Sequence, residues 1–257
     1  VERDHRAGLA VGGLEAARDA RAAAERDHDR VGVDRRPQDP LDLLLRLGAD
    51  DDVADPIGGP RSAYERLAAS DLRAGVEWER IRVAMGDERC VPAGHPESNW
   101  GQAAAALLDH VPVPASHLLR PPGELGAEAA ADAYQAALAE LPPAPAGTPR
   151  LEAVWLGVGE DGHCLSLFPG HPEVEVTDRL VVPVHHSPKP PLDRISLTLA
   201  ALAGTERLLV LAAGPAKAEP VARARAGDDR LPITRAVAAV RAAGGSVTWL
   251  LDRAAAA

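Results

Sequence analysis

Short apolar runs recur along the chain, and each predicts a buried β-strand. Stretches rich in alanine and other helix-forming residues stand between them and predict helices. The expected strands are at residues 81–85, 151–158, 208–213 and 246–251, and the expected helices are at 62–72, 99–110, 127–141 and after Gly214. Apolar strands that alternate with helices are typical of a parallel sheet covered on both faces. The pattern therefore predicts an α/β fold, a doubly wound, mainly parallel sheet with helices on both faces.

Two parts of the chain depart from this alternation. Between residues 180 and 199, two β-like runs flank a cluster of three prolines with no helix between them, which predicts a lid or a hairpin insertion. Residues 1–57 have repeated Asp, Arg and Ala and no β-branched run, so no core strand is predicted there. Residues 14–25 favour a helix, and disorder is the competing interpretation. We therefore expect a divergent N-terminal segment, 1–57, followed by an α/β domain, 58–257.

Composition argues against several classes of function. The formal net charge of −10 speaks against a nucleic-acid partner and leaves phosphate recognition to a few local cations. The sequence has no apolar run of about 18 residues, so no membrane partner is expected. Cys90 and Cys164 form neither a CxxC pair nor a disulfide framework, which favours a reducing, cytoplasmic location.

Three polar motifs stand where predicted strands end. In an open parallel sheet, ligands bind beyond the carboxyl ends of the strands, so these motifs are expected to share one pocket with acids, a histidine and cations. Taken singly, each also fits an ordinary role as a solvated charge run, a loop histidine or a helical lysine. The motifs are Gly86-Asp87-Glu88-Arg89, Gly159-Glu160-Asp161-Gly162-His163 and Gly214-Pro215-Ala216-Lys217.

Other kinds of catalytic site are disfavoured by residue spacing. Glu160, Asp161, His163 and His171 lack the HExxH or HxxxH spacing of a helical metal site, so we expect no metal. The chain has no GxSxG nucleophile elbow, which argues against a serine hydrolase. It also has no GxxxxGK[ST], and although GVGEDG at residues 157–162 fits the spacing GxGxxG, that short match is weak, so a nucleotide-binding fold is disfavoured.

Three longer segments, in this order, resemble the 6-phosphogluconolactonase family. The first reads GDERCVP followed by HPESN, and is similar to the family's DER-VP and (D/E)SN segments. The second reads LGVGEDGHCLSLFPG and is similar to LGxGxDGHxASLFPG, with Leu165 where alanine is usual. The third, SPKPPLDRISLT, is similar to SPKPPxxRITLT. The likeness extends from about Gly58 to the C-terminus.

This resemblance implies hydrolysis of 6-phospho-D-glucono-1,5-lactone to 6-phospho-D-gluconate in the oxidative pentose phosphate pathway, without a metal or organic cofactor. It also implies the doubly wound architecture shared with glucosamine-6-phosphate deaminases. By the same resemblance, His163 is the general base that activates water, and Asp161 orients it. Asp87 is then a second acid near the sugar ring, and Arg89 stabilises the oxyanion.

The substrate phosphate is assigned, again by resemblance, to Arg194 and Lys217. Arg194 offers two parallel N–H bonds, and Lys217 is a point charge near a helix N-terminus. Gly58 and Gly59 stand where the family has a glycine-rich SGGSTP loop, but here residues 56–64 read PIGGPRSAY without the Ser-Thr pair. This departure favours a shifted reading frame or a rearrangement of residues 1–57.

A small phosphosugar lactone is the expected partner of this chain, which we expect to be a monomer or a weak homo-oligomer. Two alternatives stay open. One is a glucosamine-6-phosphate deaminase-like enzyme, although that family has DEY in place of DER and lacks the KPP segment. The other is a non-catalytic, phosphosugar-binding degenerate copy, because the phosphate loop is altered.

Overall fold

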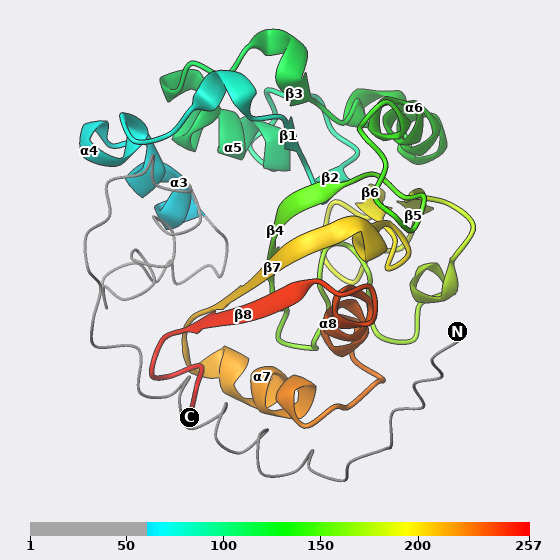
Figure 1. Ribbon diagram of the computed structural model, residues 1–257. Helices are drawn as coiled ribbons and strands as arrows, with labels where there is room; N and C mark the ends of the chain where they lie inside the picture. Colours follow the sequence, from blue (N-terminus) through cyan, green and yellow to red (C-terminus); the bar gives the residue numbers. More distant parts are fainter. Residues whose placement is uncertain (1–60) are drawn as a thin grey trace, which may run out of the picture. The chain divides into compact units, whose positions relative to one another are not determined.

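A three-stranded parallel sheet is the main sheet of the described part of the chain, residues 61–257 of this computed structural model (Figure 1). Strand β7 (Thr205–Ala212) lies between β4 (Leu151–Gly157) and β8 (Ser246–Leu251) and pairs with both in parallel. These strands confirm three of the predicted apolar runs. Because they run in the same direction, their carboxyl ends meet at one edge of the sheet.

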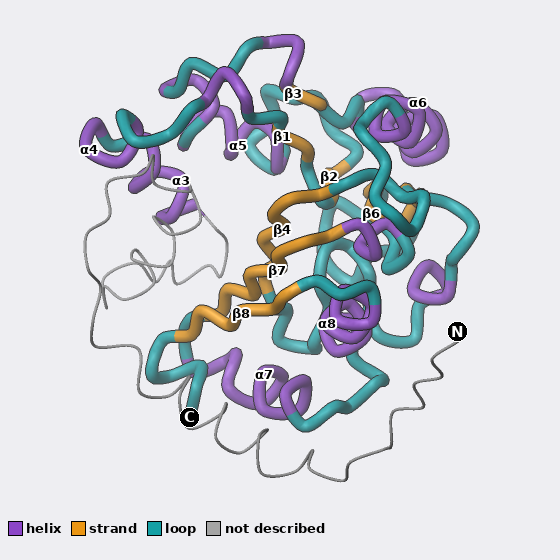
Figure 2. Tube along the Cα trace, in the orientation of Figure 1, coloured by secondary structure: helices purple, strands orange, loops and turns teal. Residues whose placement is uncertain are grey.

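Alternate residues of β7 belong to different core clusters. Leu208 and Val210 lie in a large cluster that includes residues of α7 and α8, while Leu209 packs in a second cluster with residues from α3 and from around α5. Figure 2 shows α7 and α8 on one side of this sheet and α3 and α5 on the other. Both faces are therefore covered, which confirms the doubly wound α/β fold. The helices are α3 (Arg61–Ala68), α5 (Asn99–Ala106), α7 (Ala218–Arg225) and α8 (Pro232–Ala242), the last of which is an addition to those predicted.

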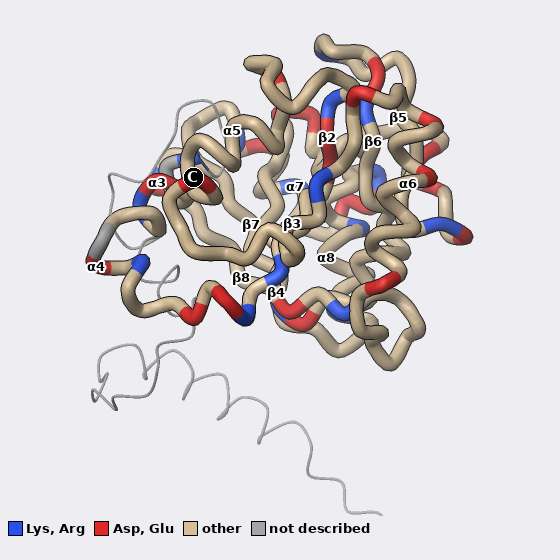
Figure 3. The backbone as a smooth tube through the Cα atoms, turned by 90° about the horizontal axis from the view of Figure 1, so that it is seen from above, with Lys and Arg blue, Asp and Glu red and all other residues tan. Residues whose placement is uncertain are grey.

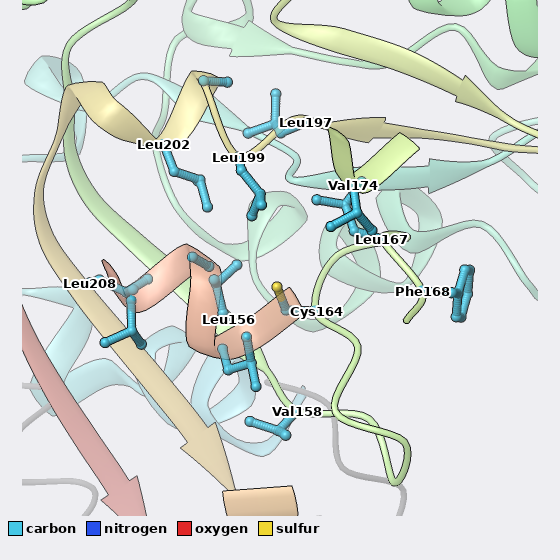
Figure 4. Packing of buried hydrophobic residues seen from close by; sticks show 14 of the residues in the cluster. Leu156, Val158, Cys164, Leu167, Phe168, Val174, Leu197, Leu199, Leu202 and Leu208 are labelled. Atoms are coloured by element: carbon cyan, nitrogen blue, oxygen red, sulfur yellow. The ribbon is translucent and has the colours of Figure 1, made fainter. Parts of the chain in front are cut away.

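The large cluster also anchors the loop that follows β4. The residues of this cluster that Figure 4 labels include side chains of the parallel sheet, of β6 and the segment after it, and of this loop. Cys164, Leu167 and Phe168 of the loop are each no more than 2% exposed. Because buried side chains hold the loop at these positions, the residues between them have a fixed place.

A short parallel pair joins β1 (Val83–Ala84) to β3 (Leu118–Leu119). The apolar run predicted at residues 81–85 thus forms a strand, but one of only two residues. Its partner β3 lies in a proline-rich stretch where no strand is predicted. Two residues are too few to show a periodic pattern, so this strand depends on its pairing rather than on its local sequence.

The segment between residues 180 and 199 forms a hairpin within a separate antiparallel sheet. Strand β6 (Arg194–Leu197) pairs with β5 (Val181–Val184) on one side and with β2 (Asp87–Arg89) on the other. All four residues of β6 are buried, so the hairpin alternative is the correct one for these strands. The charged motif at residues 86–89 also differs from its prediction, because Asp87–Arg89 form a strand rather than follow one.

Two further helices complete the arrangement. Helix α6 (Ala127–Ala139) packs against β5 and β6, and α4 (Ser70–Arg73) follows α3. Within residues 61–257, no helix has both the length and the apolar character required to cross a membrane. The predictions for residues 1–57, and those for Gly58 and Gly59, lie outside the described residues.

Candidate active site

His163 lies on a tight loop immediately after β4. The backbone N–H of Gly159 donates to the carbonyl of His163 at 2.8 Å, and the N–H of Gly162 donates to the carbonyl of Gly159 at 2.9 Å. Gly162 has a φ of 83°, in the left-handed region that favours glycine. A Cβ atom on Gly159 would lie 2.0 Å from His163 Nδ1, so the imidazole fills the space that a side chain there would need. The predicted glycine turn is confirmed, and it fixes the position of the ring.

Asp161 holds His163 by both its ring and its backbone. His163 Nδ1 lies 2.5 Å from Asp161 Oδ1, and the backbone N–H of His163 donates to the same oxygen at 3.1 Å. Burial acts to raise the pKa of Asp161, but the charge of His163 and the hydrogen bonds that it donates outweigh burial and hold this pKa below its usual value. An ionised carboxylate only accepts hydrogen bonds, so Nδ1 of His163 carries the ring proton. Nε2 is then free to accept a proton from another molecule.

Phe168 joins this pair to Arg194. The centroid of the Phe168 ring lies 4.7 Å from that of His163, and Arg194 Cζ lies 5.7 Å from the same ring. Arg194 is only 6% exposed, and its Nε and Nη2 donate to the carbonyls of Pro191 and Lys189 at 3.1 and 2.8 Å. Burial lowers the pKa of Arg194, and the charge of Asp87 acts in the opposite direction. The structure therefore brings His163 and Arg194 to the same aromatic side chain.

Asp87, Arg89 and Arg194 share one face of the antiparallel sheet. Arg89 lies directly opposite Arg194, and Asp87 is opposite Ser196, in the β2–β6 register. Figure 3 shows basic residues on both neighbouring strands. Arg89 Nη1 donates to the carbonyl of Glu97 at 2.8 Å, whereas its buried Nε has no hydrogen-bond partner among residues 61–257. Two adjacent guanidinium groups, one with a buried free donor, are suited to an anionic ligand.

Glu88 has a structural role that the sequence analysis did not assign. Its side chain points to the other face of β2 and is 2% exposed. Its carboxylate accepts from the backbone N–H groups of Arg89, Asn99 and Trp100, each at 2.7 Å, and from Ser98 Oγ at 2.9 Å. These contacts satisfy donors at the N-terminus of α5 and fix the end of β2 against that helix.

Lys217 lies at the same edge of the main sheet as the His163 loop. It ends a 3₁₀ turn, Pro215–Lys217, that follows β7, and β4 and β7 are parallel neighbours. Its side chain forms no hydrogen bond or ion pair with any residue in the range 61–257. The structure thus joins His163, Asp161, Asp87, Arg89 and Arg194 in one chain of contacts, and leaves Lys217 at the same edge without such a contact.

A cavity of about 380 Å³ opens beside Asp161. Its wall includes Phe168, Arg223 and Arg230, and both arginines donate to the carboxylate of Asp228. Nothing in the sequence distinguishes these two arginines, because each stands in an ordinary helical or loop context. Within the described residues, no group of three His, Cys, Asp or Glu side chains is arranged to hold a metal ion.

Comparison with known proteins fits this arrangement. The model of the family described as glucosamine-6-phosphate isomerases/6-phosphogluconolactonase matches residues 58–249. The chain belongs to this family. Its relatives include the 6-phosphogluconolactonase of Streptomyces coelicolor, which is 44% identical over 197 residues, 74% of each chain. The 6-phosphogluconolactonase of Mycobacterium tuberculosis is 40% identical over 205 residues, which cover 78% of this chain and 81% of the relative.

Several solved structures are similar to this chain in fold. A structure titled "Crystal Structure of devB protein" has a TM-score of 0.71 and 31% identity, and the match covers 84% of this chain and 93% of that one. The 6-phosphogluconolactonase of Leishmania guyanensis has a TM-score of 0.66 and 28% identity, with 85% and 95% covered. A monomeric glucosamine-6-phosphate deaminase matches with a TM-score of 0.63 and 21% identity over 87% and 97%, a likeness of fold alone.

Proposed function

We propose that this chain hydrolyses 6-phospho-D-glucono-1,5-lactone to 6-phospho-D-gluconate, a step of the oxidative pentose phosphate pathway. The observation that carries the proposal is the contact of both His163 and Arg194 with Phe168. This contact sets an oriented base beside a cation suited to phosphate. A sugar lactone phosphorylated at C6 has its reacting carbonyl at C1 and its phosphate at the other end, so it requires these two groups together.

The chemistry begins at His163 Nε2. With Nδ1 held by Asp161, Nε2 accepts a proton from a water molecule while the water oxygen bonds to the C1 carbonyl carbon. The carbonyl oxygen takes the negative charge of the tetrahedral intermediate. When the carbonyl re-forms, the bond between C1 and the ring oxygen breaks, and the imidazolium returns its proton to that oxygen. The product is the open-chain acid, and His163 is neutral again after it gives up its proton.

The phosphate end is proposed to involve both arginines. Because Arg89 lies opposite Arg194, its guanidinium is better suited to the phosphate than to the distant carbonyl oxygen, the role that the resemblance implied. The repulsion between two neighbouring cations falls when a phosphate dianion binds between them. Lys217 is proposed to add a third positive charge, and Asp87 to face the sugar ring.

A turnover assay tests this function. The rate at which the parent chain opens the lactone is measured against the spontaneous rate, with His163→Ala as the control. We expect clear acceleration by the parent and a loss of about 100-fold or more in the variant, because general-base catalysis contributes about 10²- to 10⁴-fold. Equal rates for the two proteins would refute the catalytic proposal.

The altered phosphate loop, PIGGPRSAY at residues 56–64, favours one other candidate, a non-catalytic phosphosugar binder. Such a protein would bind 6-phospho-D-gluconate without accelerating lactone opening. The deaminase-like alternative is tested by ammonia release from glucosamine 6-phosphate. Ammonia release above background would favour that alternative over the lactonase.

A further inference from the structure

A buried hydroxyl lies between two of the candidate site residues. Ser166 is 0% exposed, and its Oγ donates to Asp87 Oδ2 at 2.6 Å. The same oxygen accepts a hydrogen bond from Arg194 Nη1 at 3.4 Å. A hydroxyl has one proton and two lone pairs, so donation to the carboxylate leaves it free to accept from the guanidinium.

The backbone around Ser166 holds this hydroxyl in place. Leu165 has a φ of 57°, and its Cδ2 lies 2.5 Å from where a Cβ on Gly86 would be. The absence of a side chain at Gly86 thus allows the loop to pack against the start of β2. On the other side, the backbone N–H of Ser166 donates to Ser196 Oγ on β6 at 3.2 Å. The loop therefore places Ser166 against the paired strands β2 and β6, where its hydroxyl contacts both Asp87 and Arg194.

Without this hydroxyl, Asp87 and Arg194 are suited to pair directly. They occupy diagonal positions on the same face of neighbouring strands, a separation of about 7–8 Å that a long side chain can span. The described part of the chain nevertheless has no direct ion pair between them, although the charge of Asp87 acts to raise the pKa of Arg194. Arg194 is buried and Asp87 half-buried, so their opposite charges attract, and the hydroxyl of Ser166 lies where it can keep them apart.

The donors of Arg194 show why this separation matters. A guanidinium has five N–H donors, and within the described residues Arg194 forms three hydrogen bonds, to Pro191, Lys189 and Ser166. Two N–H groups therefore remain for a ligand. A direct bidentate pair with Asp87 would use two donors and cancel the charge that attracts an anion.

We propose that Ser166 is a positioning residue that separates Asp87 from Arg194, so that Arg194 keeps free donors for the substrate phosphate. The proposal rests on the phosphate-binding role proposed above for Arg194. It assigns to Ser166 neither nucleophilic attack nor contact with the reacting atoms. Its effect is on anion affinity, through the position of a neighbouring cation.

A double-variant experiment tests this role. Affinities for inorganic phosphate and for 6-phospho-D-gluconate are measured by calorimetry for the parent, Ser166→Ala, Asp87→Asn and the double variant. We expect Ser166→Ala to weaken both affinities about tenfold or more, because Arg194 turns to Asp87 and charge-assisted hydrogen bonds to the ligand are lost. Asp87→Asn removes the competing charge, so the double variant should return to within about threefold of the parent. Turnover should stay low in the double variant, since Asp87 is itself part of the proposed site.

Thr205→Ala is the matched control. It also removes a buried hydroxyl, but Thr205 is the first residue of β7, at the opposite end of the strand from the site. In the part of the chain that the structure describes, its Oγ1 has no hydrogen-bond partner. Both affinities should remain those of the parent. Thermal unfolding of every variant shows whether a loss of affinity accompanies a loss of fold.

Asp87→Glu tests the same idea without changing Ser166. The longer side chain carries the same charge past the hydroxyl and toward Arg194, so phosphate affinity should fall as it does in Ser166→Ala. This variant decides the matter if Ser166→Ala does not fold. Unchanged affinity in Asp87→Glu would then overturn the proposal.

Three other outcomes would overturn it as well. Parent-like affinity in Ser166→Ala would show that no separation is needed. A double variant as weak as Ser166→Ala would show that the hydroxyl acts only on the packing of the loop. A parent chain that binds neither ligand would remove Arg194 as an anion site. By contrast, the parent and its variants could show the expected affinities while the parent does not accelerate lactone opening. That result would refute the lactonase function and leave the role of Ser166 intact.

Discussion

Arg89 and Arg194 lie directly opposite each other on antiparallel strands, so two guanidinium groups share one face of the β2–β6 pair. Like charges at such positions destabilise a sheet. Two backbone carbonyls accept hydrogen bonds from Arg194, and one accepts from Arg89. The buried Nε of Arg89 has no hydrogen-bond partner within residues 61–257. An arrangement that costs stability in the free protein and leaves a donor unused is expected where an anion binds.

Replacement of Arg89 should therefore act on binding. In Arg89→Gln we expect KM for the lactone to rise about tenfold or more with little change in kcat, because a contact present in both ground and transition state is lost. Arg120→Gln is the control, since Arg120 pairs with Glu124 on the surface. Steady-state kinetics provide the measurement. A fall in kcat at constant KM would return Arg89 to the oxyanion role.

Glu88 should matter for stability. Its carboxylate accepts four hydrogen bonds, three of them from backbone N–H groups. In Glu88→Gln the side-chain NH₂ group would face some of these N–H and O–H groups and could not accept their hydrogen bonds. We expect the free energy of unfolding in urea to fall by about 2–3 kcal/mol, the cost of leaving buried polar groups unpaired. Glu124→Gln on the surface should change it by less than about 0.5 kcal/mol. Similar losses in the two variants would contradict the capping role.

Gly159 should be as sensitive as a catalytic side chain. In Gly159→Ala the new Cβ collides with the imidazole of His163, so we expect kcat to fall by about 100-fold, the contribution of a well-placed base. Gly94→Ala is the control, because a Cβ there meets no atom within 4 Å. The kcat of each variant is compared with that of the parent. Parent-like activity in Gly159→Ala would show that catalysis does not depend on the observed position of the His163 imidazole.

His185 should give stability a dependence on pH. The hydrogen bond to Asp193, and to a smaller extent the one to Glu128, raises the pKa of His185 above its usual value. A group whose pKa is raised by folding stabilises the fold fully below its unfolded pKa, about 6.5, and loses this effect as pH rises through the higher folded pKa.

The comparison with His185→Gln measures this effect. Because the side chain of His185 is 40% exposed and both carboxylates are more so, the difference in unfolding free energy should not exceed about 0.5 kcal/mol at pH 5.5. It should disappear by pH 9. A difference in unfolding free energy that grows as pH rises would contradict a stabilising role for protonated His185.

Much of the framework can be predicted from local pattern. The runs that form β4, β7 and β8 are long enough for their apolar character to identify them, and the glycines around His163 mark a turn at a strand end. Because the carboxyl ends of parallel strands meet at one edge, even the position of His163 and Lys217 at the same edge follows from the order of elements.

The remainder depends on register, which a single sequence does not contain. That Arg89 faces Arg194 follows from pairing between strands more than 100 residues apart in the chain. Glu88 looks like a third member of a charge run, and only its direction, opposite to that of its neighbours on β2, makes it a buried cap. Ser166 is likewise an ordinary serine in sequence, and its role appears only where the loop meets two strands.

The chain changes from one sheet to another at Gly86, between β1 and β2. The arginines therefore belong to the antiparallel sheet, whereas His163 follows a strand of the three-stranded parallel sheet, which is also distinct from the β1–β3 pair. If the phosphate and the carbonyl of one substrate molecule bind at these two places, that molecule spans two separately built parts of the protein. A lactone of a different length would then present its phosphate and its carbonyl less well at the two places, so the site would favour its substrate by length.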